Sequence, residues 1–451
     1  MSETIARAIA PLPAREQLET LVADILAEAR ARGATAAETA VSFDSALSVT
    51  VRLGEVEKLE HHRQRGLGVT VYFGRSRGSA STADWRPEAI RDTVQSACAI
   101  ARHTAADPCA GLADPDRLAR EIPDLDLYHP WPLSAEEGID LARQCEAAAL
   151  AVDPRIRNSE GGGVSTQTGL VVYGNSHGFC GGYPTSRHSI SCSVIARDDR
   201  GMQRNHWYAV ARDHATLEAP VAVGQQAARR ALRRLGSRRL GTRQAPVLFA
   251  PELARGLIGH FVAAIRGGAL YRKASFLLDR LGTVVFPKCV TIRERPHLPG
   301  ALASAPFDGE GVATADRDVV GEGVLRGYVL DSYSARRLGM ETTGNAGGTH
   351  NLIVEPGPLG HDELLRQLDT GLWVTELLGH GINLVTGDYS RGAAGFWVEQ
   401  GEIQYPVQEI TIAGHLAAMF EGIVAVGNDV DARGGIRCGS LLLERMTVAG
   451  E

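Results

Sequence analysis

The spacing of apolar residues changes abruptly near the start of the chain, from a helical period to the two-residue period of a strand. Residues 16–32 place their aliphatic side chains on one face of a helix. Residues 47–53 and 67–72 then alternate in polarity, so we expect two strands joined by the charged segment 55–65. The sequence holds 51 glycines and only 6% aromatic residues, which favours many turns between antiparallel strands. These patterns predict an α+β fold.

Helix and strand signals continue in the same mixture further along the chain. Asp84 followed by Pro87 indicates a helix that runs to about His103. Ser134 with Glu137 forms a capping box that opens another helix. Three strands and a closing helix are expected next, over residues 165–173, 188–196, 206–211 and 214–235.

The chain is expected to divide into three regions. A helix-sheet-helix domain occupies residues 1–110, a central α/β domain residues 111–240, and a β-rich C-terminal domain residues 241–451. The first two form an N-terminal α/β half with antiparallel sheets and flanking helices. The third is larger and β-rich.

The charge distribution argues against nucleic-acid binding, because the formal net charge is -6 and the pI is near 6.2. One basic segment, residues 229–243, nevertheless carries seven arginines, interrupted by leucines at helical spacing. We interpret this segment as a solvated helix end and linker.

The cysteines and the hydropathy pattern favour a cytoplasmic protein. Seven cysteines are scattered without a Cys-x-x-Cys spacing, as expected for reduced thiols. Residues 1–13 lack the pattern of an export signal, and no run of about 18 apolar residues occurs. We expect neither export nor membrane insertion.

Three short patterns suggest chemistry but are better explained by structure. The Gly-x-Ser-x-Gly string at 174–178 is not followed by the helix that a nucleophile elbow needs, so a hairpin loop is expected. Cys180, His188 and Cys192 are possible zinc ligands, but His188 and Cys192 lie about 13 Å apart along an extended strand, too far to share one ion. The glycine-rich segment 344–348 favours close approach of the backbone to a strand or an extended ligand.

The densest polar segment is the quartet Asp388, Tyr389, Ser390 and Arg391. We expect these residues in a loop between a strand that ends at Val385 and a strand over 395–398. Such a loop either is an exposed turn or lines a cleft.

Residues 247–265 are expected to form an apolar strand, a proline start and an amphipathic helix. By itself this segment contains nothing catalytic. Five segments carry a resemblance to a known family, at residues 272–279, 331–339, 343–345, 381–392 and 406–414. Through them the chain resembles the TldD/PmbA family of cytoplasmic metallopeptidases, and specifically its PmbA (TldE) branch.

The resemblance implies a dimer around an enclosed peptidase chamber. In the TldD branch a helix with the motif His-Glu-x-x-x-His and a distant cysteine hold zinc, and the glutamate activates water. Aligning this motif with residues 246–264 places Ile258, Gly259 and Ala263 at the His, Glu and His positions. His260 is out of frame, about 200° around the helix from Ile258. Cys438 matches the cysteine position.

The resemblance therefore implies a non-catalytic subunit that holds no zinc itself and pairs with a zinc-bearing TldD-type catalytic subunit. Its expected role is to shape the chamber and to bind unfolded or extended peptide, with Asp388–Arg391 and His260 as candidate chamber residues. Family members are linked to leader-peptide removal from modified peptides and to degradation of unfolded proteins. Two alternatives stay open. The chain is itself a hydrolase with an atypical metal site around His260, His380 and Cys438, or it is a peptide-binding homodimer without enzyme activity.

Overall fold

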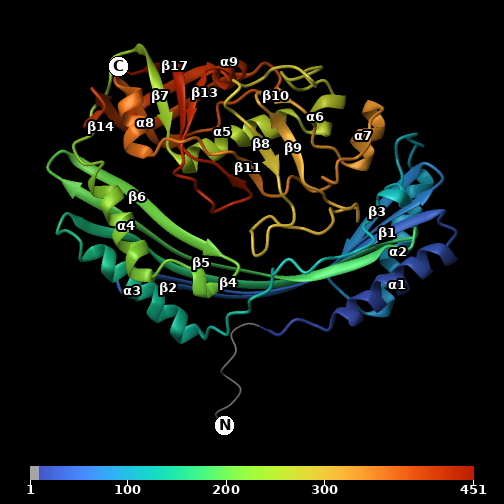
Figure 1. Ribbon diagram of the computed structural model, residues 1–451. Helices are drawn as coiled ribbons and strands as arrows, with labels where there is room; N and C mark the ends of the chain where they lie inside the picture. Colours follow the sequence, from blue (N-terminus) through green and yellow to red (C-terminus); the bar gives the residue numbers. More distant parts are fainter. Residues whose placement is uncertain (1–9, 451) are drawn as a thin grey trace, which may run out of the picture.

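The computed structural model describes residues 10–450 and has the α+β architecture that the sequence predicts. A long curved sheet forms one layer, with helices on its convex side and the C-terminal part of the chain on its concave side (Figure 1). Residues 1–9, which make up most of the segment tested for an export signal, lie outside the described residues. Among residues 10–450, no helix has both the length and the apolar character needed to cross a membrane. All seven cysteines are free thiols.

The curved sheet has six antiparallel strands in the order β3-β2-β1-β4-β5-β6. Its strands are β1 (Ala36–Arg52), β2 (Glu55–Phe73), β3 (Ser76–Thr82), β4 (Ile156–Asn175), β5 (Cys180–Asp198) and β6 (Gly201–Ala211). Its helices are α1 (Arg15–Ala31), α2 (Pro87–His103), α3 (Ala135–Leu150) and α4 (Pro220–Leu232). Because β1 pairs with β4, the strands of residues 36–82 and 156–211 form a single continuous sheet.

The charged segment 55–65 is a strand, and the expectation of a connection there was wrong. β1 and β2 form one long hairpin whose turn, Leu53-Gly54, has two positive φ angles, as a tight two-residue hairpin turn requires. The outer part of β2 is exposed. The charged residues of β2 are compatible with a strand because their side chains reach solvent. The register of this strand is fixed by the turn and by its pairing with β1.

Local capping signals set the helix starts more reliably than apolar spacing does. The predicted capping box is present, because Glu137 N donates to Ser134 Oγ at 3.1 Å and Ser134 N donates to Glu137 Oε2 at 2.8 Å. The helix expected over 214–235 is shorter. A 3-10 turn covers His214–Thr216, and α4 begins only at Pro220, which suits the first helical position.

The C-terminal part contains two further sheets. The first has the order β10-β9-β8-β11-β16, and the second has the order β14-β13-β12-β7-β17-β15. Their strands are β7 (Arg243–Phe249), β8 (Ile292–Glu294), β9 (Arg317–Gly321), β10 (Val324–Leu325), β11 (Leu352–Val354), β12 (Gly371–Leu378), β13 (Asp388–Glu399), β14 (Glu402–His415), β15 (Ile423–Val426), β16 (Ile436–Arg437) and β17 (Leu441–Ala449). The helices are α5 (Pro251–Ala264), α6 (Gly267–Tyr271), α7 (Ser332–Leu338), α8 (His361–Leu368) and α9 (Leu416–Glu421).

Separate hydrophobic cores stabilise the two sides of the molecule. Two clusters lie under the curved sheet, one where α1 and α2 pack on it and one where α3 and α4 pack on it. The largest cluster belongs to the C-terminal part and surrounds α5, with Phe249, Ile258 and Phe261 fully buried. This core fixes α5 against the strands that border the candidate site.

Candidate functional site

Helix α5 carries the residues that the sequence resemblance aligned with a metal-binding motif, and its inward face is apolar. Pro251 stands in the first turn, and the helix follows β7 directly. Ile258, at the first ligand position, has no exposed surface and packs in the C-terminal core. Gly259, at the glutamate position, has only Ile436 Cδ1 within 4.0 Å of where a side chain would begin. The helix thus lies beside β16, close to the segment that carries Cys438.

The side chains at these positions do not fit a zinc ion. Ile258, Gly259 and Ala263 offer no donor atom, and Cys438 is fully buried with its Sγ 3.1 Å from Gly439 O. Burial raises the pKa of the Cys438 thiol, and the negative charge of Asp429 raises it further. A neutral thiol is a poor metal ligand. Among residues 10–450, no three His, Cys, Asp or Glu side chains lie close enough together to hold a metal ion. His260, His380 and Cys438 therefore do not form such a group.

Three of the predicted site residues meet beside α5. The rings of His260 and Tyr389 are 6.2 Å apart in an edge-on arrangement. Burial and the nearby Arg391 guanidinium lower the pKa of His260, so its imidazole is neutral near pH 7. Burial raises the pKa of Tyr389 to about 12, while Arg391 opposes this shift. The cluster is a neutral imidazole and a neutral phenol next to one guanidinium.

The quartet Asp388–Arg391 is not a loop, which corrects the sequence interpretation. These residues begin β13 and pair with residues 412–415 of β14, while the preceding strand β12 already ends at Leu378. In a strand, successive side chains point to opposite faces. Tyr389 is therefore buried beside α5, whereas Asp388 and Ser390 are exposed. The structure brings Tyr389 and Arg391 to His260 and separates the other two residues from them.

The Gly-x-Ser-x-Gly string forms the turn of the β4–β5 hairpin, as predicted. Ser176 Oγ accepts a hydrogen bond from Ala37 N at 3.0 Å, which ties the turn to β1. His188 is buried between Thr166, 2.8 Å from its Nδ1, and the carbonyl of His129, 2.8 Å from its Nε2. Both ring nitrogens are engaged in hydrogen bonds, so His188 is a structural residue.

A cavity of about 510 Å³ lies between the concave face of the curved sheet and the loops of the C-terminal part. Ala40, Gly169 and Thr185 line it from β1, β4 and β5, and the loops at 303–309 and 346–350 line it from the opposite side. The glycine-rich segment 344–348 thus forms part of a cavity wall. Gly344, Gly347 and Gly348 have φ angles of 69°, 99° and 141°, which residues with a Cβ rarely adopt.

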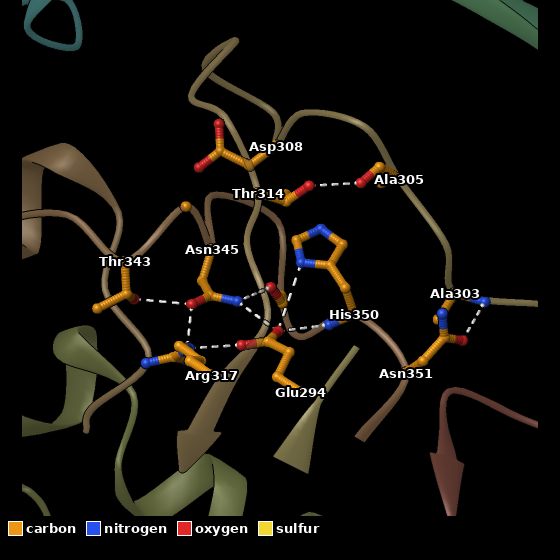
Figure 2. Close-up of polar contacts among 12 residues, drawn as sticks. Glu294, Ala303, Ala305, Asp308, Thr314, Arg317, Thr343, Asn345, His350 and Asn351 are labelled. Carbon is orange, nitrogen blue, oxygen red and sulfur yellow. Dashed lines mark hydrogen bonds and ion pairs between the residues drawn. The ribbon is translucent and has the colours of Figure 1, made fainter. Parts of the chain in front are cut away.

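A buried polar network holds this wall in place, and Figure 2 shows its members. Glu294 is 2% exposed and accepts hydrogen bonds from Asn345 Nδ2 at 2.8 Å, from His350 N at 2.6 Å and from Arg317 Nε at 2.7 Å. Burial alone would raise the pKa of Glu294, but the hydrogen bonds from His350 and the charge of Arg317 hold it below its ordinary value. The carboxylate is therefore ionised and positions the loop rather than exchanging protons.

A second cavity forms a groove along the first half of α5, between β6 and β12. β6 is the edge strand of the curved sheet, and β12 pairs with β7 only over residues 372–374. Among residues 10–450, the next stretch of β12, residues 375–378, pairs only with β13. This stretch and residues 204–208 of β6 line a groove of about 400 Å³. Two strand edges therefore border one cavity.

The groove is lined by charged side chains, and each of its arginines has a carboxylate partner, Glu160, Glu252 or Asp431. Four arginines and two carboxylates line it, namely Arg204, Arg230, Arg255, Arg433, Glu252 and Glu376. The Arg255 guanidinium reaches Tyr208 Oη at 3.2 Å and Asp431 at 3.4 Å, and Arg433 stacks 3.8 Å above the Trp207 ring. These contacts join α5 to the edge of β6 across the groove.

The arginine-rich segment 229–243 is not a solvated linker throughout, and the sequence interpretation missed this site. Arg234 is 4% exposed, with its guanidinium 2.5 Å from Glu376 Oε2. Arg230 lies 2.7 Å from Glu252 Oε1. The carboxylate partners belong to α5 and β12, which are distant in sequence, so the local charge pattern gave no sign of the pairing. Glu294 and Arg317 were not singled out either, although Asn345 lies in one of the segments that carry the family resemblance.

Comparison with known proteins agrees with this architecture over the whole described chain. Models of domain 1, the central domain and the C-terminal domain of PmbA/TldA metallopeptidases match residues 37–101, 128–235 and 242–450. The metalloprotease PmbA of Escherichia coli O157:H7 is 52% identical over 415 residues, which is 92% of each chain. The PmbA homologue of Haemophilus influenzae is 48% identical and covers 97% of this chain and 98% of its own.

Two crystal structures show the same fold. A Bacteroides thetaiotaomicron protein named as a candidate modulator of DNA gyrase has a TM-score of 0.92 at 28% identity, covering 97% of this chain and all of its own. TldE from Thermococcus kodakarensis has a TM-score of 0.81 at 19% identity, covering 95% of this chain and all of its own. The chain belongs to the PmbA/TldD metallopeptidase family, on its PmbA (TldE) side.

Proposed function

We propose that this chain is the non-catalytic subunit of a cytoplasmic zinc metallopeptidase, paired with a TldD-type subunit that carries the metal and the general base. The observation that carries this proposal is the apolar face of α5. Ile258, Gly259 and Ala263 stand where two imidazoles and a carboxylate would be needed, and Ile258 is fully buried. Without those groups α5 neither binds zinc nor deprotonates a water molecule.

The role of the chain in the assembly is to bind extended peptide. The free edge of β12 over residues 375–378 offers backbone donors and acceptors to a peptide strand, as in β-strand addition. The groove beside it is large enough for side chains. Backbone recognition of this kind suits leader peptides and unfolded proteins, because it selects an extended conformation rather than a sequence.

The decisive experiment measures metal content and peptide cleavage with and without the partner. Purified alone, the chain should hold no stoichiometric zinc and cleave no peptide. Adding a TldD-type chain should shift nearly all material to a heterodimer in size-exclusion chromatography and restore cleavage. A TldD-type chain with its motif glutamate replaced serves as the control, and this pair should form a heterodimer that does not cleave.

Two other outcomes would replace the proposal by its alternatives. Stoichiometric zinc together with cleavage by the chain alone would make it an active hydrolase with an atypical metal site. Peptide binding by a homodimer that ignores every TldD-type chain would make it a binding protein without enzyme activity.

The candidate chamber residues have their own test in the assembled complex. Arg391→Gln removes the charge beside His260, and Tyr389→Phe removes the phenolic hydroxyl while keeping the buried ring. If this cluster faces the chamber, both changes should lower peptide turnover while heterodimer formation is unchanged. Ser390→Ala, on the opposite face of β13, is the matched control. Unchanged turnover in Arg391→Gln and Tyr389→Phe would contradict the placement.

A further inference from the structure

A third cavity, of about 230 Å³, lies at the N-terminal end of α5 and continues the groove. It shares Asn205, Arg230, Glu252 and Thr375 with the groove, so the two spaces adjoin. Its volume equals that of about eight water molecules at ~30 Å³ each, which is the scale of a single amino-acid residue. A peptide that follows the groove toward the start of α5 would therefore place one end in this cavity.

Three arginines from the end of α4 line the cavity, and one of them has no carboxylate partner. Arg230 pairs with Glu252 and Arg234 with Glu376. Arg233 is an exposed residue that forms no ion pair among residues 10–450, and its guanidinium lies 5.2 Å above the Trp373 ring and 4.9 Å above the Phe396 ring. Partial burial and the neighbouring positive charge of Arg230 lower the pKa of Arg233. An anion in the cavity would act in the opposite direction and raise the pKa of Arg233.

The cavity wall also contains hydrogen-bond donors that lack acceptors. Trp373 is 8% exposed and Arg234 is 4% exposed, yet within residues 10–450 Trp373 Nε1 has no hydrogen-bond partner, and neither has Arg234 Nε, although Arg234 Nη1 donates to Glu376. The hydroxyl of Thr375, which also lines the cavity, has none either. Buried donors of this kind are nearly always satisfied. Their grouping at one cavity points to an acceptor that a ligand supplies.

The start of α5 adds to the preference for an anion. Pro251 has no N–H and Leu253 N donates to Ala250 O at 2.9 Å, so among residues 10–450 only Glu252 N is left as a first-turn donor of this 14-residue helix. The carboxylates in the wall are engaged elsewhere. Glu252 faces Arg230, and Asp429 accepts from Ser440 N at 2.8 Å and Ser440 Oγ at 2.7 Å. Neither neutralises Arg233.

We propose that this cavity binds a carboxylate, and that the carboxylate is the C-terminal end of the peptide in the groove. The inference rests on the proposed peptide-binding function and names the peptide end that is recognised. One guanidinium without a partner balances one negative charge, and its planar fork matches the two oxygens of a carboxylate. The chain thereby sets the direction in which a peptide lies along α5.

The test measures binding of short acetylated peptides to the purified full chain by titration calorimetry. A peptide with a free C-terminal carboxylate should bind at least tenfold more tightly than the same peptide with a C-terminal amide. Arg233→Gln should abolish this preference, and Trp373→Phe, which keeps an aromatic side chain but replaces the indole and its N–H donor by a smaller phenyl ring, should reduce it. Arg229→Gln, one residue before Arg230 on the same helix but exposed and outside the cavity, should leave it unchanged.

Three results would overturn the assignment. These are equal affinity for the acid and the amide, an unchanged preference in Arg233→Gln, and tighter binding of inorganic phosphate than of the acid peptide, which would indicate a general anion site. A peptide that carries an internal Asp and a C-terminal amide tests the other source of carboxylate. Its binding at the level of the free acid would likewise contradict recognition of the C-terminus.

Failure of this inference and failure of the proposed function give different results. If the wild-type chain assembles with a TldD-type chain but shows no preference for the acid peptide, only the assignment of the cavity is wrong. If wild type prefers the acid but never assembles with a TldD-type chain, the subunit function falls and the cavity remains.

Discussion

The imidazole of His260 lies edge-on to the phenol ring of Tyr389, with 6.2 Å between the ring centres. The contact joins α5 to β13, two elements separated by more than one hundred residues of sequence. It explains why Tyr389 is 2% exposed although it belongs to a strongly polar segment. Helix α5 thus contributes a packing surface to its neighbouring sheet.

Strand alternation predicts opposite behaviour for adjacent residues of β13. Tyr389→Ala should lower the free energy of unfolding by about 3 kcal/mol, because it removes a buried ring and leaves a cavity. Ser390→Ala, on the exposed face, should change it by less than about 0.5 kcal/mol. Urea unfolding of both variants checks this, and comparable losses would contradict the alternation.

Two glycines near the candidate site should respond in opposite directions to alanine. At Gly256, inside α5, nothing lies within 4 Å of an added Cβ, so Gly256→Ala should stabilise the protein by about 0.5–1 kcal/mol. At Gly395 an added Cβ would lie 1.9 Å from Trp373 O, so Gly395→Ala should destabilise it by about 1–3 kcal/mol or more. Thermal unfolding distinguishes them. A stabilised Gly395→Ala variant would show that β12 and β13 are not packed this closely.

Because of Glu310, the free energy of unfolding should fall as the pH rises. Burial raises its pKa to about 7 from 4.5, and Asp308 and Asp331 add to the shift against a hydrogen bond from Ser332 N. The folded state therefore binds the proton more tightly than the unfolded state. The stabilisation is complete below about pH 4.5 and is lost as the pH rises toward 7. Its size is at most about 3 kcal/mol, and less to the extent that solvent reaches the side chain.

Glu310→Gln should remove this part of the pH dependence, because the amide stays neutral and its oxygen still accepts from Ser332 N. Urea unfolding between pH 4.5 and 8 would reveal a flatter profile in Glu310→Gln than in wild type. Glu402→Gln, at an exposed position, is the control and should keep the wild-type slope. Parallel profiles for Glu310→Gln and wild type would contradict the prediction.

Cys438 and Cys289 should differ sharply in reactivity toward thiol reagents. Cys289 is exposed, whereas Cys438 is fully buried and its thiol pKa is raised, so little of it is thiolate. In the native protein, alkylation followed by peptide mass spectrometry should detect Cys289 quickly and Cys438 only after denaturation. Rapid native labelling of Cys438 would show that the thiol is accessible and would revive its role as a metal ligand.

Much of the fold could be predicted because its signals are local. The capping box at Ser134 and Glu137, the proline at the start of α5 and the hairpin at 174–178 all depend on residues a few positions apart. The pairing of β1 with β4 could not be predicted in this way. It joins strands more than one hundred residues apart. Their side chains follow the same two-residue period as those of the other strands, so the period does not tell which strands pair.

The candidate site shows the same division. The absence of zinc donors at Ile258, Gly259 and Ala263 is a property of the sequence alone, because no fold can give a methyl group or a hydrogen atom a lone pair for a metal. The tertiary structure decided that Arg234 is buried against Glu376 and that Arg233 lies over Trp373 without a carboxylate. The burial of Arg234 and the surroundings of Arg233 depend on which strand, distant in sequence, lies next to the end of α4. Sequence therefore determined what α5 cannot do, and the contacts of Arg233 and Arg234 with β12 determined where we propose that an anion binds.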